Sequence, residues 1–241
     1  MSSPDLQTLF HGRRYRFTPG MPAGEVASIA DGGGRVLLTY RSFASVVGIV
    51  AALVIAIVLV TGVAAALFLA AEERPGAAMA AVLLAFTFAA VIAALVPRTR
   101  VTLYHDSQPA LRIVQRSRLS FPETTWAVRT DDGTTLATIR KGALSRLSTN
   151  RWTISTPPDQ SGAAYAAEES FGRALLRKIL GKFRRRFEAN MRVIHNGLPA
   201  AVIIRRPDEQ GEADYLELAA GADLDPRVAV ALATLVFGSE P

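Results

Sequence analysis

The chain has 241 residues, no cysteine and a formal net charge of +6 at pH 7. The lack of cysteine excludes disulfides and thiolate metal sites. Half of the residues are apolar and the mean hydropathy is +0.24, which is high for a soluble domain with charged faces. This length allows one or two domains, so the distribution of apolar residues along the chain decides the organisation.

One pattern occurs four times along the chain. An apolar residue is followed by two or three polar residues rich in Asp, Asn and Gly, and then by alternating apolar residues closed by Arg. It is found at residues 28–41, 103–116, 127–141 and 192–206. Alternation with period two is typical of strands, and Asp-Gly or Asn-Gly supplies the positive φ that hairpin turns need. Each occurrence therefore predicts a β-hairpin, and we expect residues 1–42 to contribute N-terminal strands to the same sheet.

Two long apolar stretches separate the first hairpin from the second. Residues 42–71 and 77–96 contain no charged side chain. A helix rises about 1.5 Å per residue and the hydrocarbon core is about 30 Å thick, so each stretch is long enough to cross a bilayer. With the polar turn at residues 72–76 they predict a transmembrane helical hairpin over residues 43–97. The alternative, two helices in a large soluble core, is disfavoured because the chain has little else with which to bury them.

Arginine placement predicts the orientation of this hairpin, because basic residues favour the cytoplasmic side. The turn contains a single basic residue, Arg74. The flanking arginines are Arg13, Arg14, Arg16, Arg35 and Arg41 on one side and Arg98, Arg100 and Arg112 on the other. We therefore expect a cell-membrane protein with two spans and both termini in the cytoplasm. The absence of ionisable residues within the spans argues against an ion pathway. Their Ala and Gly residues favour close helix packing, within the hairpin or in a homo-oligomer.

Residues 225–237 predict a C-terminal helix, with Asp225 as N-cap and Pro226 at the first helical position. After Arg227 it is apolar on every face, so it is either buried or in a membrane, and it is too short to span a bilayer. An antiparallel barrel closed around this helix would bury it and leave no exposed strand edge. The alternative is a helix packed on one face of an open sheet.

The predicted fold class is an α+β membrane protein. It combines a two-helix transmembrane hairpin with an antiparallel β-barrel that encloses the hydrophobic C-terminal helix. Residues 98–241 would form the cytoplasmic barrel domain.

Residues 170–185 predict a basic amphipathic helix, with apolar residues on one half of the helical wheel and most basic residues on the other. The expected lipid-binding residues are Arg173, Arg177, Lys178, Lys182, Arg184, Arg185 and Arg186. Without these seven of its 27 basic residues the chain has 20 basic against 21 acidic residues, so this segment accounts for the whole positive charge. The preceding residues 155–170 contain few large apolar side chains and are interpreted as a flexible loop.

Three interpretations of the basic helix are open. In the first it lies in the bilayer interface, where each basic residue near anionic lipid contributes about 1 kcal/mol. In the second it packs its apolar face on the barrel and leaves its basic face in solvent. In the third it binds nucleic acid or an acidic protein. Aromatic residues are not interleaved on the basic face, which counts against nucleic acid.

The strand–turn–strand units, followed by a helix that begins Leu-Asp-Pro-Arg, resemble the tubby C-terminal-like superfamily, and within it the phospholipid scramblases and LURP-one-related proteins. The positions that carry the resemblance are Val128, Asp131, Gly133, Leu136, Ile139, Arg140, Val193, Asn196, Gly197, Val202, Ile204, Tyr215, Leu216, Leu218, Leu224 and 225–237. They cover residues 100–241, extended by 13–41 if the first hairpin belongs to the barrel. The resemblance implies a twelve-stranded barrel wrapped around the C-terminal helix.

The chain departs from that pattern in its membrane segment. Scramblases are thought to use the C-terminal helix, whereas here two spans lie between the first hairpin and the next strand. If residues 1–42 belong to the barrel, the transmembrane hairpin is an insertion in one of its loops. The chain has no cysteine cluster for palmitoylation and no acidic calcium-binding loop, which argues against calcium-triggered scrambling.

No residue combination typical of catalysis or metal binding is found. His11, His105 and His195 are scattered, and motifs of a nucleophile elbow, a zinc protease or a phosphate-binding loop are absent. We therefore expect no enzymatic activity, no cofactor and no metal, but a membrane-anchored barrel that binds anionic phospholipid in a lipid-binding or scaffolding role. The alternatives are scramblase-like phospholipid translocation and an interaction module for an acidic protein. No nucleic-acid partner is expected.

Overall fold

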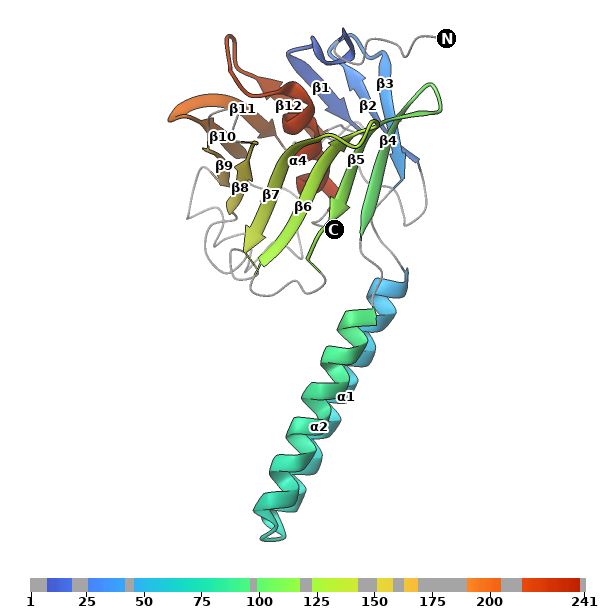
Figure 1. Ribbon diagram of the computed structural model, residues 1–241, viewed down its shortest axis with the longest axis vertical. Helices are drawn as coiled ribbons and strands as arrows, with labels where there is room; N and C mark the ends of the chain where they lie inside the picture. Colours follow the sequence, from blue (N-terminus) through green and yellow to red (C-terminus); the bar gives the residue numbers. More distant parts are fainter. Residues whose placement is uncertain are drawn as a thin grey trace, which may run out of the picture. The chain divides into compact units, whose positions relative to one another are not determined.

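The computed structural model describes residues 8–18, 26–41, 46–95, 99–117, 123–142, 151–157, 163–168, 190–204 and 214–238. The chain divides into two compact units, Met1–Phe43 with Arg100–Pro241, and Ala44–Thr99. The first unit is a closed barrel of twelve antiparallel strands with one helix inside it, and the second is a pair of long helices (Figure 1).

Every strand of the barrel pairs with its neighbours in the sequence, and β1 pairs with β12 to close the sheet. A short 3₁₀ helix, η1 (Thr8–Phe10), precedes the first strand. The strands are β1 (Arg14–Phe17), β2 (Val26–Asp31), β3 (Val36–Arg41), β4 (Arg100–His105), β5 (Gln108–Gln115), β6 (Glu123–Thr130), β7 (Thr135–Gly142), β8 (Arg151–Ser155), β9 (Ala163–Glu168), β10 (Met191–His195), β11 (Leu198–Ile204) and β12 (Asp214–Leu218). The antiparallel barrel predicted from the sequence is confirmed, and the open-sheet alternative is wrong.

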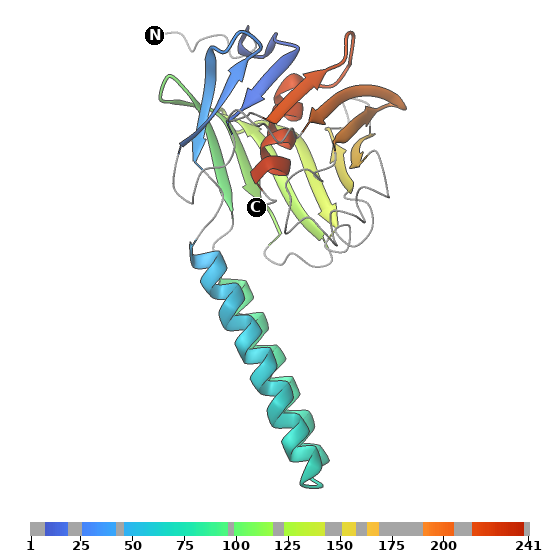
Figure 2. The same ribbon diagram turned by 180° about the vertical axis from the view of Figure 1, so that it is seen from behind.

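Helix α4 (Pro226–Gly238) lies inside this barrel, as the two opposite views show (Figures 1 and 2). All nine residues from Val228 to Val236 are buried. Alternate residues of the strands point at the helix, and Ile29, Leu103 and Ile139 among them have no exposed surface. The helix and the inner face of the sheet therefore form one apolar core.

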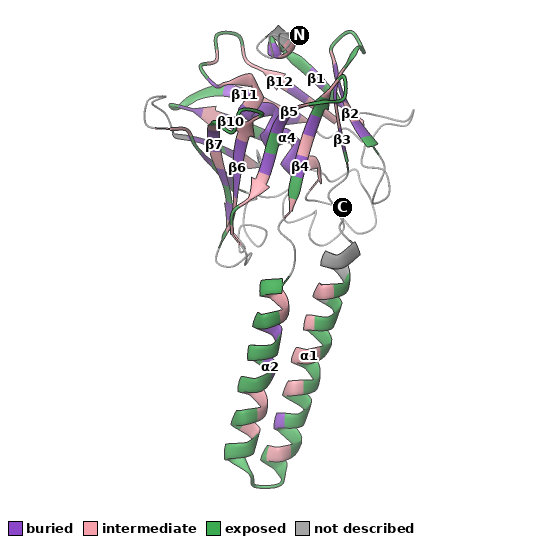
Figure 3. Cartoon of the chain, turned by 45° about the vertical axis from the view of Figure 1, so that its right-hand side comes forward, coloured by how far each residue is buried: buried purple, intermediate pink, exposed green. Residues whose placement is uncertain are grey.

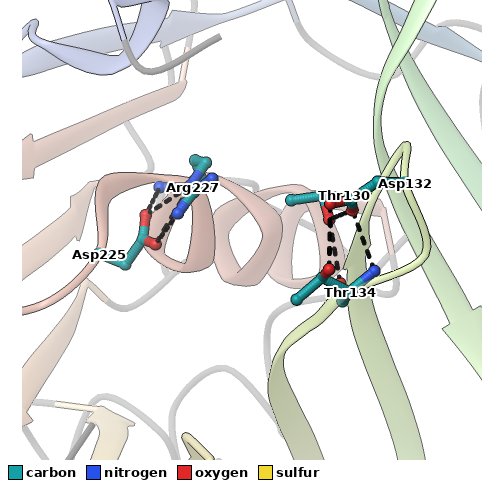
Figure 4. Close-up of polar contacts among 5 residues, drawn as sticks. All are labelled: Thr130, Asp132, Thr134, Asp225 and Arg227. Carbon is teal, nitrogen blue, oxygen red and sulfur yellow. Dashed lines mark hydrogen bonds and ion pairs between the residues drawn. The ribbon is translucent and has the colours of Figure 1, made fainter.

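The start of α4 is capped by its own sequence, as predicted. Asp225 Oδ1 accepts a hydrogen bond from the Arg227 backbone N–H at 2.8 Å, which satisfies one of the unpaired donors of the first turn. The Arg227 side chain then donates to both oxygens of the same carboxylate, and this raises the pKa of Arg227 (Figure 4). On the β6–β7 turn shown in the same figure, hydrogen bonds from Thr130 and Thr134 lower the pKa of Asp132.

The four repeated sequence patterns are hairpins, which confirms the prediction. They form β2–β3, β4–β5, β6–β7 and β10–β11, and each carries a register shift near the end of its first strand. Their turns contain positive φ angles at Gly34, Asp106 with Ser107, Gly133, and Asn196 with Gly197. The turns of β4–β5 and β10–β11 have two consecutive residues with positive φ, as a type I′ turn requires.

One interpretation of the sequence is wrong. Residues 155–170 were expected to form a flexible loop, but β9 lies within them and pairs with both β8 and β10. The strand escapes detection because its inward residues are Ala164 and Ala166 rather than large apolar side chains. Its neighbour β8 supplies the bulk, since Trp152 lies opposite Ala166 and Ile154 opposite Ala164.

The second unit consists of α1 (Val46–Ala71) and α2 (Pro75–Leu95). Both are long and apolar enough to span a membrane, and almost none of their described surface is buried (Figure 3). The alternative of two helices in a soluble core is therefore wrong. The hydroxyls of Thr61 and Thr87 donate to the carbonyls of Ile57 and Leu83, four residues earlier in the same helix, so neither hydroxyl needs a partner from outside.

The two helices approach most closely where both carry small residues. A Cβ atom added to Gly62 would lie 2.2 Å from the Cβ of Ala85. We expect Gly62→Val to destabilise the hairpin by about 1–3 kcal/mol, because the helices must move apart. The free energy of unfolding of the full chain would be measured by titrating mixed micelles with sodium dodecyl sulfate. Gly76→Ala is the control, because its added Cβ meets no atom within 4 Å. Equal unfolding of the two variants would show that the contact does not hold the helices together.

Two buried tyrosines give the barrel a dependence on alkaline pH. Burial raises the pKa of both Tyr15 and Tyr40 to about 12, and the negative charge of Asp214 adds to the effect on Tyr40. Since an unfolded tyrosine titrates near 10, the folded chain holds these protons more tightly. Their contribution to stability is complete below about pH 10 and is lost as the pH rises through about 12, on the order of 3 kcal/mol for each residue.

Tyr15→Phe tests this dependence. The Tyr15 hydroxyl is buried next to the Gly12 backbone and makes no other polar contact, so its removal should change the stability at pH 7 by no more than about 1 kcal/mol. The variant should lose less stability than the parent chain between pH 10 and 12 in urea unfolding curves. Tyr104→Phe, at a side chain that is 39% exposed, is the control. Parallel pH profiles for the parent and Tyr15→Phe would contradict the assignment.

Candidate functional site

The alternating strand directions divide the connections of the barrel between two ends. We call one the turn end, because it carries the short turns of β2–β3, β4–β5, β6–β7 and β10–β11 and the start of α4. We call the other the long-loop end. It carries the six connections at residues 18–25, 42–99, 116–122, 143–150, 169–190 and 205–213. The chain therefore leaves the barrel for α1 and returns from α2 at the long-loop end.

Exposed arginines mark the long-loop end. We call Arg41, Arg100, Arg116 and Arg151 the basic rim, since each lies at or next to a strand end there. The first three have no ion-pair partner among the described residues, and the Arg151 guanidinium lies 4.8 Å from the centre of the Tyr165 ring.

Acidic residues are more numerous at the turn end, where Arg13, Arg14 and Arg35 also lie. The acidic residues there are Asp31, Asp106, Asp131, Asp132, Asp223 and Asp225, whereas the described strand ends at the long-loop end carry Glu123, Glu168 and Asp214. The described part of the barrel is thus charged unevenly along its axis, with positive charge concentrated where the chain connects to the two apolar helices.

The basic amphipathic helix expected at residues 170–185 lies outside the described residues, together with all seven predicted lipid-binding residues from Arg173 to Arg186. Its attachment points are nevertheless fixed by the strands on either side. Strand β9 ends at Glu168 and β10 begins at Met191, and both of these positions lie at the long-loop end. The most basic segment of the sequence therefore leaves and rejoins the barrel at the end that carries the basic rim.

A groove of about 440 Å³ lies along β4, β5 and β6 and extends from Arg100 of the basic rim to Gly133 on the β6–β7 turn. We call it the arginine groove. Its charged lining residues are Arg100, Arg112 and Arg129, and Tyr104 and Pro109 add an aromatic and an apolar surface. These residues come from three strands that are neighbours both in the sheet and in the sequence.

Two of the groove arginines lie directly opposite each other. Arg112 on β5 is the register partner of Arg129 on β6, and like charges in this position destabilise a sheet. Asp131 relieves part of the repulsion, because its Oδ1 accepts a hydrogen bond from Arg112 Nη2 at 2.7 Å. The Arg129 Nε atom is buried and has no hydrogen-bond partner. Three guanidinium groups and one carboxylate leave a formal charge of +2 in and beside the groove.

This donor set suits an oxyanion. Guanidinium groups present paired N–H donors that match the oxygens of phosphate or carboxylate, and they stay charged at any physiological pH. Arg112 and Arg129 both line the groove, so their guanidinium groups carry positive charge beside a bound anion. The arginine groove can therefore hold a phosphate group, with Tyr104 and Pro109 beside whatever carries it.

No pattern in the sequence predicted this groove. Arg100 and Arg112 entered the prediction only as markers of membrane orientation, and Arg129 had no assigned role. They are 12 and 17 positions apart in sequence, so only the strand register brings Arg112 opposite Arg129. A cross-strand comparison of the predicted hairpins could have placed Arg112 near Arg129 if the register had been known.

The histidines and tryptophans have structural roles. His105 Nδ1 lies 2.7 Å from the Leu37 carbonyl oxygen, which ties β4 to β3 across the pair of strands that the helical hairpin interrupts. Trp126 and Trp152 are core residues with ring centres 5.4 Å apart, and Lys141 Nζ lies over the Trp152 ring at 4.3 Å. Within the described ranges no group of three or more His, Asp or Glu residues is placed to hold a metal ion.

No protein-family model, no curated protein and no solved structure matches the chain. The function proposed below is therefore based on the surface and topology of the chain itself.

Proposed function

We propose that the chain is a two-span membrane protein whose cytoplasmic barrel binds anionic phospholipid in a non-enzymatic, lipid-binding or scaffolding role. The observation that carries the proposal is the gathering of four features at the long-loop end of the barrel. They are the two connections to α1 and α2, the basic rim, the opening of the arginine groove at Arg100 and the attachment points of the basic segment.

Helices α1 and α2 supply the membrane anchor in this proposal. Four residues, 42–45, separate β3 from α1, and another four, 96–99, separate α2 from β4. A connection of this length covers roughly 15 Å when extended, so Arg41 and Arg100 lie within about that distance of the ends of α1 and α2 and would face the lipid headgroups. The excess of arginine on this side supports the proposed cytoplasmic location of both termini.

Phosphate-bearing headgroups are the ligands that these surfaces fit. The cytoplasmic leaflet is anionic, and each basic residue held near it contributes about 1 kcal/mol. The guanidinium groups of Arg41, Arg100 and Arg116, which form no ion pair with other described residues, favour such a surface, and the arginine groove offers a place for an individual headgroup phosphate. An interfacial helix at residues 170–185 would add six basic residues to the same contact, and Arg186 follows it directly.

The resemblance to the tubby C-terminal-like superfamily belongs to this proposal. That resemblance implies a twelve-stranded barrel around a C-terminal helix, which agrees with the architecture of this chain. Scramblase-like translocation is the second candidate drawn from it. The described helices argue against a polar path through a single hairpin, since they contain no ionisable side chain and their Thr61 and Thr87 hydroxyls bond to their own helix. A homo-oligomer through the small residues of α1 and α2 stays a prediction.

Flotation with liposomes tests the lipid-binding role. A soluble version of the chain, with residues 43–97 replaced by a Gly/Ser linker, should float with vesicles that contain phosphatidylserine but not with pure phosphatidylcholine. Salt should weaken the binding. The double variant Arg112→Gln/Arg129→Gln should bind roughly tenfold or more weakly, because two charges near the surface are lost. A variant with Arg177, Lys178, Lys182, Arg184 and Arg185 changed to Gln tests the basic segment separately.

The matched control removes the same charge from two arginines outside the groove lining. Arg13→Gln/Arg35→Gln changes two exposed arginines at the turn end, and it should bind like the parent. Equal losses in the groove variant and the control would mean that only net charge matters. If the unsubstituted soluble chain is folded but does not bind anionic vesicles, the result would contradict the proposal and favour an acidic protein partner. Transfer of labelled lipid between the leaflets of vesicles that contain the full chain would favour translocation.

A further inference from the structure

Asp131 lies beside the arginine groove and is bonded to one of its lining residues, Arg112, a contact that the local folding of the turn does not explain. It lies on the β6–β7 turn, but the described hydrogen bonds that shape this turn involve its neighbours. Asp132 accepts from the Thr134 backbone N–H at 3.0 Å, the Thr130 N–H donates to the Thr134 carbonyl, and Gly133 has a φ of 88°. The one hydrogen bond described for the Asp131 side chain goes to Arg112. The Asp131 carboxylate therefore bonds to a residue of the groove and takes no described part in the hydrogen bonds of the turn.

The contact between Asp131 and Arg112 is placed so that it can open. Both side chains are about half exposed, at 47% and 49%, and an exposed ion pair contributes little to stability. Asp131 is at the mouth of a turn, where its side chain can rotate into solvent without disturbing the strands. An anion that reaches the groove can then take over the Arg112 donors.

The electrostatics of the groove explain why a carboxylate is held there. Arg112 and Arg129 face each other across β5 and β6, and without a nearby negative charge their repulsion is uncompensated. The hydrogen bond and ion pair described for Asp131 go to Arg112, and none is described between Asp131 and Arg129. A headgroup phosphate has enough acceptor oxygens to bind both arginines at once, which a single carboxylate beside Arg112 does not do here.

We infer that Asp131 is a built-in competitor for the arginine groove, a carboxylate that occupies Arg112 and must be displaced when a headgroup phosphate binds. The inference rests on the proposed lipid-binding function of the groove. A lipid must then carry enough negative charge to replace the Asp131 carboxylate at Arg112. Neutral lipids do not displace it.

The test measures lipid binding to the full chain. The chain in a nonionic detergent would be titrated with phosphatidylglycerol, and with phosphatidylcholine as the neutral comparison, and bound lipid would be counted by native mass spectrometry. Asp131→Asn should lower the dissociation constant for phosphatidylglycerol about twofold to fivefold, the range expected when an exposed ion pair no longer competes. Inorganic phosphate added as a competitor shows whether the phosphate alone is recognised or the whole lipid is needed.

Two further variants make the outcome specific. Asp223→Asn removes one negative charge from the same end of the barrel at an exposed residue outside the groove lining, and it should leave the dissociation constant unchanged. In an Arg112→Gln background, Asp131→Asn should give no gain, because its competition acts through Arg112. A gain that persists in that background, or an equal gain from Asp223→Asn, would overturn the inference.

The failure of the inference can be told apart from the failure of the proposed function. If Arg112→Gln and Arg129→Gln leave phosphatidylglycerol binding unchanged, the groove does not bind lipid and the proposed function of this surface is wrong. If they weaken binding while Asp131→Asn has no effect, the groove binds lipid and only the role of Asp131 is wrong.

Discussion

The burial of α4 is the constraint on which the rest of the barrel depends. A helix that is apolar on all sides must be covered on all sides, and the nine residues from Val228 to Val236 are covered by a sheet that closes on itself. Many of these residues are alanines, so the helix is thin enough to share the interior with Trp152, Tyr15 and Phe17 from the strands. The polar Asp225 and Arg227 stay at the mouth, where they bond to each other.

The order of the strands around the barrel decides at which end each long segment emerges. Because each strand runs opposite to the one before it, connections fall alternately at the two ends, and long segments inserted after odd-numbered strands all emerge at one end. The helical hairpin after β3 and the basic segment after β9 are such insertions. The helical hairpin interrupts the chain between β3 and β4, but the two strands stay joined. Thr39 pairs with Tyr104, and a His105 ring nitrogen contacts the Leu37 carbonyl oxygen. Both segments therefore leave and rejoin the barrel at the same end.

Features with local causes were predictable from the sequence. The hairpin turns follow from Asp-Gly and Asn-Gly, the N-cap of α4 from Asp-Pro, and the two long helices from their length and lack of charge. Features that depend on cross-strand partners were not. Strand β9 has small inward residues that make sense only beside Trp152 and Ile154, and the arginine groove exists only because one register places Arg112 opposite Arg129. The basic rim was hidden because its arginines are far apart in sequence.

The orientation of the barrel at the membrane is the central claim, and distance from labelled residues to the bilayer tests it most directly. The chain has no cysteine, so Ser117→Cys at the long-loop end and Asp223→Cys at the turn end each give one attachment site for a fluorophore. Energy transfer to acceptor-labelled headgroups would be measured on the full chain in vesicles with anionic lipid. The account predicts stronger transfer from residue 117 than from residue 223. Stronger transfer from residue 223 would contradict the account, and so would equal transfer from both.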